Sequence, residues 1–187
     1  SADVYPDQVA VVDGDHEVTY QELNTLVDRL GHALLGLGLK HQDVVALASR
    51  NTLEFLVTYF ACARAGLICM PVNLGLRPGE MAFCLRDAKA RVMIAESALR
   101  DVVQAAMKEG PDELQRVFWF GAEDVPVDED FDVLLMSGRT EPLEVFVADR
   151  DLVQLLYTSG TTALPKGVLT SHLAVTMAGL SNAIGHK

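Results

Sequence analysis

Residues that could do chemistry gather in one stretch of this chain, from Leu155 to Val168. Apolar residues begin and end it. Between them lie hydroxyl side chains, glycines, a proline and a lysine, in the order Thr158-Ser159-Gly160-Thr161-Thr162-Ala163-Leu164-Pro165-Lys166-Gly167. Hydroxyls beside glycine make a loop rich in short hydrogen-bond donors and open backbone N–H groups, and the lysine adds a positive charge. Such a loop is suited to holding phosphate oxygens.

The stretch is not a Walker A loop. That loop requires G-x-x-x-x-G-K-[ST], with glycine directly before the lysine and a magnesium-binding hydroxyl directly after it. Here Pro165 precedes Lys166 and Gly167 follows it, so both requirements fail. The sequence therefore indicates a different phosphate-binding device.

The segment from Tyr157 to Gly167 resembles the signature loop of the AMP-forming acyl-CoA synthetases, members of the adenylate-forming superfamily. Their pattern runs Tyr-Thr-Ser-Gly-Thr-Thr-Gly-x-Pro-Lys-Gly, and the chain matches each fixed position except Ala163. Two other segments are similar to family motifs, Thr19-Tyr20-Gln21-Glu22-Leu23 and Ala65-Gly66 with Pro71-Val72-Asn73. Asparagine at position 73, where peptide-synthetase adenylation domains usually have aspartate, favours the acyl-CoA branch.

The resemblance implies a reaction and a set of binding residues. Members activate a carboxylic acid with Mg-ATP, release pyrophosphate to form an acyl-adenylate, and usually pass the acyl group to coenzyme A. Positioning and neutralisation of the pyrophosphate charge carry most of such catalysis. The implied ATP-binding residues are Thr158, Ser159, Gly160, Thr161, Thr162, Lys166 and Gly167, with Thr161 or Thr162 also in the magnesium shell. No catalytic residue is assigned.

Alanine at position 163 is the one departure from the signature. Glycine there permits positive φ and close backbone approach. Alanine adds a methyl group and, where φ is positive, about 1 kcal/mol of strain. We expect a less mobile loop or weaker phosphate binding, which Ala163→Gly would reverse without harming the fold.

Four other features invite a functional assignment but receive a structural interpretation. His172 follows Ser171 near a helix start, so capping or packing is favoured over a general base. Asn73 is read as a turn residue and Trp119 as a core residue. The acidic stretch 123–132 lacks the glycine and closing glutamate of a calcium-binding EF-hand loop, so it is interpreted as a solvated loop.

The elements that must position the loop alternate between strands and helices. Apolar runs predict strands at 44–48, 67–72, 92–95, 117–120, 152–157 and 168–170, after a hairpin of 9–13 and 16–19. Two predicted helices begin with capping boxes and end at glycines, from Thr19–Glu22 to Gly38 and from Asn51–Glu54 to Gly66. A third begins at Pro78, and a fourth runs from Ala98 to Glu109 with Ser97 as its cap. The last two run from Phe131 to Met136 and onward from a Ser171 cap. This order predicts an α/β fold, a mostly parallel sheet flanked by helices. The loop follows the strand Leu152–Tyr157, where ligands bind in such sheets.

Composition narrows the class of protein. Half of the 187 residues are hydrophobic and 22% are charged, which is typical of a globular chain. The net charge of −11 excludes nucleic acid as an expected partner. Cys62, Cys69 and Cys84 show no C-x-x-C spacing and predict reduced core thiols in a cytoplasmic protein. Arg64 and Pro71 interrupt the most apolar window, so no membrane span is expected, while peripheral membrane contact and a homodimer stay open.

The resemblance also implies a domain organisation. Residues 1–187 correspond to an incomplete N-terminal domain, with βα units and the loop at 157–167, and the C-terminal part of the enzyme is absent. The full-length protein is expected to be an acid–thiol ligase of fatty acid metabolism that uses ATP, Mg²⁺ and coenzyme A on a fatty or other apolar acid. The 187 residues alone are expected to be inactive. Two alternatives are a fatty acyl-AMP ligase and a non-catalytic scaffold or phosphate-binding fragment.

Overall fold

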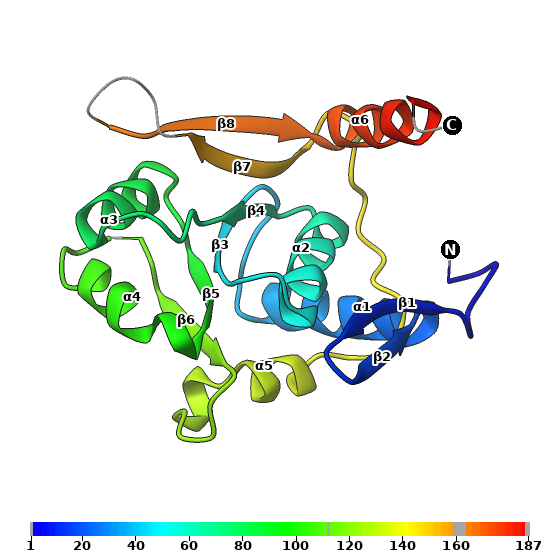
Figure 1. Cartoon of the computed structure of the whole chain (residues 1–187), viewed down its shortest axis with the longest axis horizontal. Helices are drawn as coiled ribbons and strands as arrows, with labels where there is room; N and C mark the ends of the chain where they lie inside the picture. Colours follow the sequence, from blue (N-terminus) through cyan, green and yellow to red (C-terminus); the bar gives the residue numbers. More distant parts are fainter. Residues whose placement is uncertain (1, 112, 159–163, 186–187) are drawn as a thin grey trace.

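A six-stranded sheet organises the described part of the chain, which in this computed structural model comprises residues 2–111, 113–158 and 164–185 (Figure 1). The strand order is β6-β5-β3-β4-β7-β8. The strands are β3 (Val44–Ala48), β4 (Ile68–Pro71), β5 (Val92–Glu96), β6 (Arg116–Phe120), β7 (Leu152–Thr158) and β8 (Lys166–Ser171). Neighbouring strands are parallel except β7 and β8, which are antiparallel. The predicted mostly parallel sheet is confirmed.

Helices cover both faces of the sheet because its central strands are apolar on both sides. Val45 and Leu47 of β3 face one core with α1 (Tyr20–Gly36), α2 (Leu53–Ala65) and α5 (Phe131–Ser137). Ala46 and Ala48 face the other, with α3 (Pro78–Asp87) and α4 (Arg100–Met107). The remaining elements are the hairpin β1 (Val9–Asp13) and β2 (His16–Thr19), two short 3₁₀ turns η1 (Ser97–Leu99) and η2 (Val127–Glu129), and the final helix α6 (His172–Gly185).

Capping side chains and glycines lie at most of the helix ends where they were expected. The Thr19–Glu22 capping box of α1 is confirmed, with Thr19 N donating to the Glu22 carboxylate at 2.8 Å. Gly38 and Gly66 have φ of 89° and 70° and follow α1 and α2, as the left-handed stop position requires. Ser171 caps α6, because its Oγ accepts from Ala174 N at 3.3 Å.

Two predicted helix starts are wrong. The N-cap of α2 is Thr52 rather than Asn51, because Leu53 N donates to the Asp13 carboxylate at 2.8 Å from the β1–β2 hairpin. Glu54 therefore lies too early in the helix to close a capping box. Ser97 does not cap a helix running from Ala98 to Glu109. It opens the 3₁₀ turn η1, and α4 spans only Arg100–Met107.

The attachment of β7 to β4 uses side chains as well as backbone. The backbone register joins one pair of residues, Cys69 and Gln154. Gln42 adds a second link, because its amide Nε2 donates to Leu152 O at 3.0 Å and its Oε1 accepts from Leu152 N at 2.9 Å. Tyr59 OH donates to the Gln154 side chain at 3.0 Å. These contacts hold the β7–β8 hairpin to the rest of the sheet.

The core contains the residues that were expected to be structural. Cys62, Cys69 and Cys84, all within the described residues, are buried and free of disulfides. Trp119 is 4% exposed, with the Arg100 guanidinium 5.4 Å from its ring centroid. The acidic stretch is more ordered than predicted, because Asp130 accepts from two backbone N–H groups and caps α5. Among the described residues, no helix has both the length and the apolar character that crossing a bilayer demands.

Candidate phosphate-binding site

The two ends of the loop lie side by side. Thr158 ends β7, Lys166 begins β8, and the two residues are direct partners in the antiparallel register. Partners in such a ladder have Cα atoms about 5 Å apart. Four other predicted binding residues, Ser159, Gly160, Thr161 and Thr162, lie outside the described residues, as does Ala163, while Gly167 is the second residue of β8. The fold therefore brings the first hydroxyl and the lysine of the predicted set together.

The loop emerges at the carboxyl edge of the parallel sheet. Because β7 runs parallel to β4, Thr158 lies at the same edge as the residues that follow β3, β4 and β5. Figure 1 shows this end of the β7–β8 hairpin above α3. The crevice outside the carboxyl ends of strands is where open α/β sheets bind ligands. The expected position of the loop at a strand end is confirmed.

The charges at this edge leave Lys166 as a cation suited to an anionic ligand. Arg50 follows β3 and pairs with Glu96 at the end of β5, with Arg50 Nε 3.0 Å from the carboxylate oxygens. The hydrogen bond from Arg50 lowers the pKa of Glu96, so this buried carboxylate remains ionised and neutralises the guanidinium. Lys166 is exposed and makes no ion pair within the described part of the chain.

Tyr157 and Gly167 form the next pair of the hairpin register. Tyr157 OH donates to the Asp87 carboxylate at 2.6 Å, which links β7 to the last residue of α3. Burial, followed by this hydrogen bond, raises the pKa of Tyr157, so the phenol stays protonated as a donor. A Cβ atom on Gly167 would lie 3.2 Å from Tyr157 Cζ, so the ring occupies the space that a side chain would need.

The sequence of this chain matches the family described as "AMP-binding enzyme" over residues 1–186. The chain belongs to the AMP-binding enzyme family. The expected resemblance to adenylate-forming enzymes is thus confirmed, and the fold that carries the loop is the fold of this family.

Individual relatives fall into two groups. The chain is 31% identical over 161 residues to "Long-chain-fatty-acid--CoA ligase FadD13" of Mycobacterium tuberculosis, covering 86% of this chain and 31% of that protein. It is 29% identical over 170 residues to a linear gramicidin synthase of Brevibacillus parabrevis, covering 91% of this chain and 2% of that protein. The chain thus spans about a third of the length of the ligase it matches, and far less of the synthase.

Solved structures agree with this placement in the AMP-binding family. The anthranilate CoA ligase AuaEII, solved with anthranoyl-AMP, superposes with a TM-score of 0.85 at 25% identity, over 90% of this chain and 32% of that chain. The N-terminal domain of FACL13 from Mycobacterium tuberculosis superposes with a TM-score of 0.81 at 31% identity, over 91% of this chain and 42% of that chain.

His172 lies far from the loop. Because β8 runs antiparallel to β7, its six residues carry the chain back to the opposite edge of the sheet. At about 3.3 Å per residue, His172 is roughly 20 Å along the strand from Lys166. Its N–H donates to Asp151 O at 3.0 Å at the start of α6. This position fits the predicted structural role better than a general base at the loop.

Asn73 has the turn geometry that was expected of it. Its side-chain Oδ1 accepts from Gly75 N at 2.9 Å, which closes an Asx turn after β4. Two tertiary contacts of this site were not predicted from the sequence, Arg50 with Glu96 and Tyr157 with Asp87. The available signal for the first contact was a pair of opposite charges near the ends of two neighbouring strands, with Arg50 two residues after β3 and Glu96 the last residue of β5. The second had no local signal, because 70 residues separate its members.

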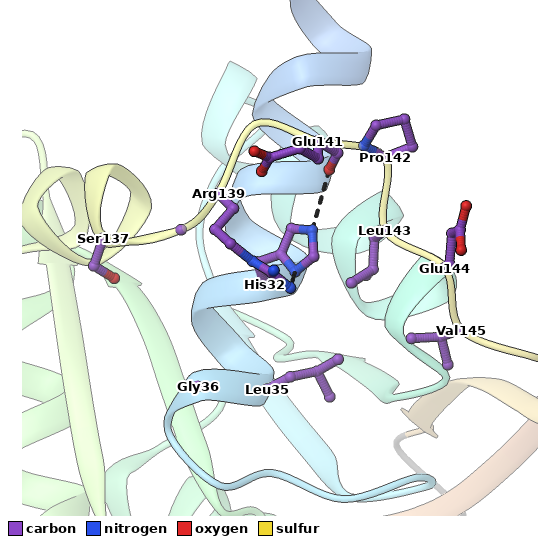
Figure 2. Close-up of a pocket in the computed structure, with 11 residues that line it drawn as sticks. His32, Leu35, Gly36, Ser137, Arg139, Glu141, Pro142, Leu143, Glu144 and Val145 are labelled. Carbon is purple, nitrogen blue, oxygen red and sulfur yellow. Dashed lines mark hydrogen bonds between the residues drawn. The ribbon is translucent and has the colours of Figure 1, made fainter.

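A separate hollow of about 730 Å³ lies between α1 and the segment that follows α5 (Figure 2). Figure 2 shows His32 within it, between Arg139 and Glu141. His32 Nε2 lies 3.1 Å from Glu141 O, and Arg139 Nη2 lies 3.3 Å from His32 Nδ1. Figure 1 places α1 and α5 at the far side of the molecule from the turn end of β7 and β8, so this hollow is separate from the phosphate-binding site.

Proposed function

We propose that these residues form the phosphate-binding part of an AMP-forming ligase, which activates a carboxylic acid with Mg-ATP and passes the acyl group to coenzyme A. The observation that carries the proposal is the register pair of Thr158 and Lys166 at the carboxyl edge of a parallel sheet. Membership of the AMP-binding enzyme family supports it. In domain terms, residues 1–187 are an incomplete N-terminal domain with the loop at 157–167.

The proposed chemistry is a displacement at the α-phosphorus of ATP. The acid's carboxylate attacks that atom and pyrophosphate leaves, which forms the acyl-adenylate. The thiol of coenzyme A then attacks the acyl carbon, so that the thioester forms and AMP leaves. Lys166, exposed and without an ion pair among the described residues, neutralises charge that develops on the leaving pyrophosphate. Thr158 supplies a hydroxyl donor directly opposite it.

The rest of the proposed binding set rests on the sequence signature. The β- and γ-phosphates are held by Ser159, Gly160, Thr161 and Thr162. Gly167, which has no side chain, lets the backbone of β8 approach the phosphates closely. Thr161 or Thr162 contributes a hydroxyl to the Mg²⁺ shell that accompanies ATP. Hydroxyl oxygen is a ligand that magnesium accepts beside phosphate oxygens.

The proposed acid is fatty or otherwise apolar. The names of relatives support this range, since they include long-chain fatty acid ligases and a 4-hydroxybenzoate/benzoate ligase of Rhodopseudomonas palustris. The three buried, free cysteines agree with a reducing, cytoplasmic location, which is part of the proposal.

Pyrophosphate release with ATP and a panel of acids tests the activity. In the complete enzyme, Lys166→Ala should lower kcat by roughly 10²-fold or more, because a preorganised charge at the leaving group is lost. Lys108→Ala, which removes an exposed lysine after α4, is the matched control and should leave turnover unchanged. Equal turnover of the two variants would contradict the role of Lys166.

Pyrophosphate release and thioester formation together separate the alternatives. The 187-residue chain alone should release no pyrophosphate, because the resemblance places the ribose and carboxylate contacts and a magnesium-binding glutamate elsewhere. Thioester formation by the complete enzyme distinguishes an acyl-CoA ligase from a fatty acyl-AMP ligase.

An association or scaffold role is a second candidate, favoured by one observation. Apolar side chains of the β7–β8 hairpin and α6 are exposed, at 50% for Val168, 53% for Leu169 and 54% for Met177. Calorimetry with ATP and pyrophosphate on the parent and on Lys166→Ala distinguishes a binding domain from a scaffold. Heat of binding that Lys166→Ala abolishes supports the loop, and no heat from the parent supports the scaffold.

A further inference from the structure

The last residue of α3 makes a contact that its position in the helix does not favour. Asp87 places a carboxylate at the C-terminus of α3, where the helix dipole and the terminal carbonyl groups repel negative charge. A hydrogen-bond donor from another element offsets this repulsion. Tyr157 OH supplies it, 2.6 Å from Asp87 Oδ2. The hydrogen bond therefore joins α3 to β7 one residue before Thr158.

The ring of Tyr157 extends this link to the second strand of the hairpin. A Cβ atom on Gly167 would lie 3.2 Å from Tyr157 Cζ and 3.0 Å from Leu155 Cδ1, closer than side chains ordinarily approach. Gly167 does not have a positive φ, so glycine is needed here for space rather than for backbone conformation. The Tyr157 ring thus lies against the Gly167 backbone and fixes the first residues of β8.

Among the described residues, the other contacts of β7 with the sheet lie farther from Thr158, at Leu152, Gln154 and Leu155. β7 shares one register pair with β4, at Cys69 and Gln154, four residues before Thr158. β8 is the edge strand, and its Val168 and Leu169 are half exposed. The tether, the hydrogen bond from Tyr157 to Asp87 of α3, is therefore the described side-chain hydrogen bond nearest to Thr158 and Lys166 along the hairpin.

We propose that Asp87 and Tyr157 are positioning residues for phosphate binding, which hold Thr158 and Lys166 in place through one hydrogen bond and one ring contact. The proposal rests on the proposed function of the loop. Neither residue needs to touch the nucleotide. Asp87 binds the hydroxyl of Tyr157 and so holds the Tyr157 ring against Gly167. The next register pair of the hairpin, Thr158 and Lys166, carries the hydroxyl and the ammonium group.

Kinetics of the complete enzyme test the proposal. Tyr157→Phe and Asp87→Ala should each raise KM for ATP roughly tenfold, the loss expected for one charge-assisted hydrogen bond. Thioester formation from a synthetic acyl-adenylate should keep its kcat, because that half-reaction does not use the pyrophosphate site. Asp87→Asn retains an acceptor oxygen and should recover most of the ATP affinity. The double variant should be no worse than either single variant, since both remove the same bond.

Matched controls separate positioning from general stability. Tyr20→Phe removes a phenol hydroxyl from α1 and should change neither KM for ATP nor thioester formation. An unchanged KM for ATP in Tyr157→Phe, or an equal loss in both half-reactions, would overturn the proposal. So would a failure of Asp87→Asn to improve on Asp87→Ala.

A readout that needs no activity separates failure of the tether from failure of the proposed function. In ¹⁵N-labelled 187-residue chain, Tyr157→Phe and Asp87→Ala should shift the amide resonances of Gly167 and Lys166, and Asp87→Asn should not. Unmoved resonances overturn the tether even in an active enzyme. Shifted resonances together with a Lys166→Ala variant of full activity would show that the tether exists and that the loop does not bind pyrophosphate, which overturns the positioning role.

Discussion

The centre of the sheet and the β7–β8 hairpin both contain apolar runs but differ in burial. Val45, Ala46 and Leu47 of β3 are 0% exposed, because helices cover both faces of that strand. On the hairpin, Leu156 is 39% and Leu169 is 53% exposed. An apolar run thus predicts a strand in both regions. It does not say whether helices cover both faces of the strand.

Truncation of a large side chain in each region is the strongest test of this comparison. Leu47→Ala should lower the free energy of unfolding by about 2–5 kcal/mol, because it leaves a cavity between two helical layers. Leu169→Ala is the matched change on the hairpin and should cost about 0.5 kcal/mol or less. Urea denaturation measures both values. Similar costs would show that Leu169 is buried in solution.

An ion pair between α1 and α2 also binds the segment that connects α5 to β7. Asp28 of α1 accepts from Arg64 Nη1 at 2.8 Å and from Leu143 N at 2.9 Å. Asp28→Ala leaves both donors without their acceptor and should cost about 3 kcal/mol, the lower end for a broken buried pair, since Arg64 is partly exposed. Asp132→Ala, an exposed change on α5, is the control. Chemical denaturation that gives equal costs would refute the importance of this tie.

Two glycines with positive φ allow the cost of close packing to be separated from the cost of backbone strain alone. Gly66 has φ of 70°, and an added Cβ would lie 2.6 Å from His41 Nδ1. Gly14 has φ of 60° with no atom within 4 Å of the added Cβ. Gly66→Ala should cost about 2 kcal/mol and Gly14→Ala about 1 kcal/mol. Thermal unfolding of the two variants should differ in that order, and the reverse order would contradict the packing argument.

The smallest expected effect is at the start of α3, the helix that supports the hairpin. Hydrogen bonds from Arg77 lower the pKa of Glu80 to about 2. The unfolded chain has the higher Glu pKa, about 4.3, so it binds more protons between these values. The stabilisation is therefore present above about pH 5 and is lost as the pH falls toward 2.

A carboxyl NMR titration checks this assignment. In Arg77→Ala, the midpoint of Glu80 should rise toward the ordinary range of glutamate. Glu22, whose pKa is lowered by the backbone of Thr19, should keep its midpoint in the same variant. A Glu80 midpoint that stays near 2 would place the cause elsewhere.

Features that depend on neighbouring residues could be predicted, and features that depend on distant ones could not. Thr19, Gly38 and Gly66 act within one turn of their own helix, so their roles follow from the sequence. Thr52 displaced Asn51 as a cap because Asp13, from another element, binds the backbone of Leu53.

The candidate site divides in the same way. Residue types and spacing identified the loop between Thr158 and Gly167 and its place after a strand. The adjacency of β7 to β4 could not be inferred, because the 80 residues 72–151 separate the strands. Asp87 could not be linked to Tyr157 for the same reason. Sequence therefore located the binding loop but not the contacts that hold it.

The side chain of Gln42 has a consequence for slow motions of the native state. Its carboxamide exchanges two hydrogen bonds with the backbone of Leu152, so it substitutes for a rung of the sheet where β7 meets β4. An amide side chain can rotate away without unwinding either strand. The seam is thus a natural boundary for local unfolding. Amide hydrogens of β7 and β8 should exchange with deuterium in one cooperative opening, ahead of those in β3 and β5.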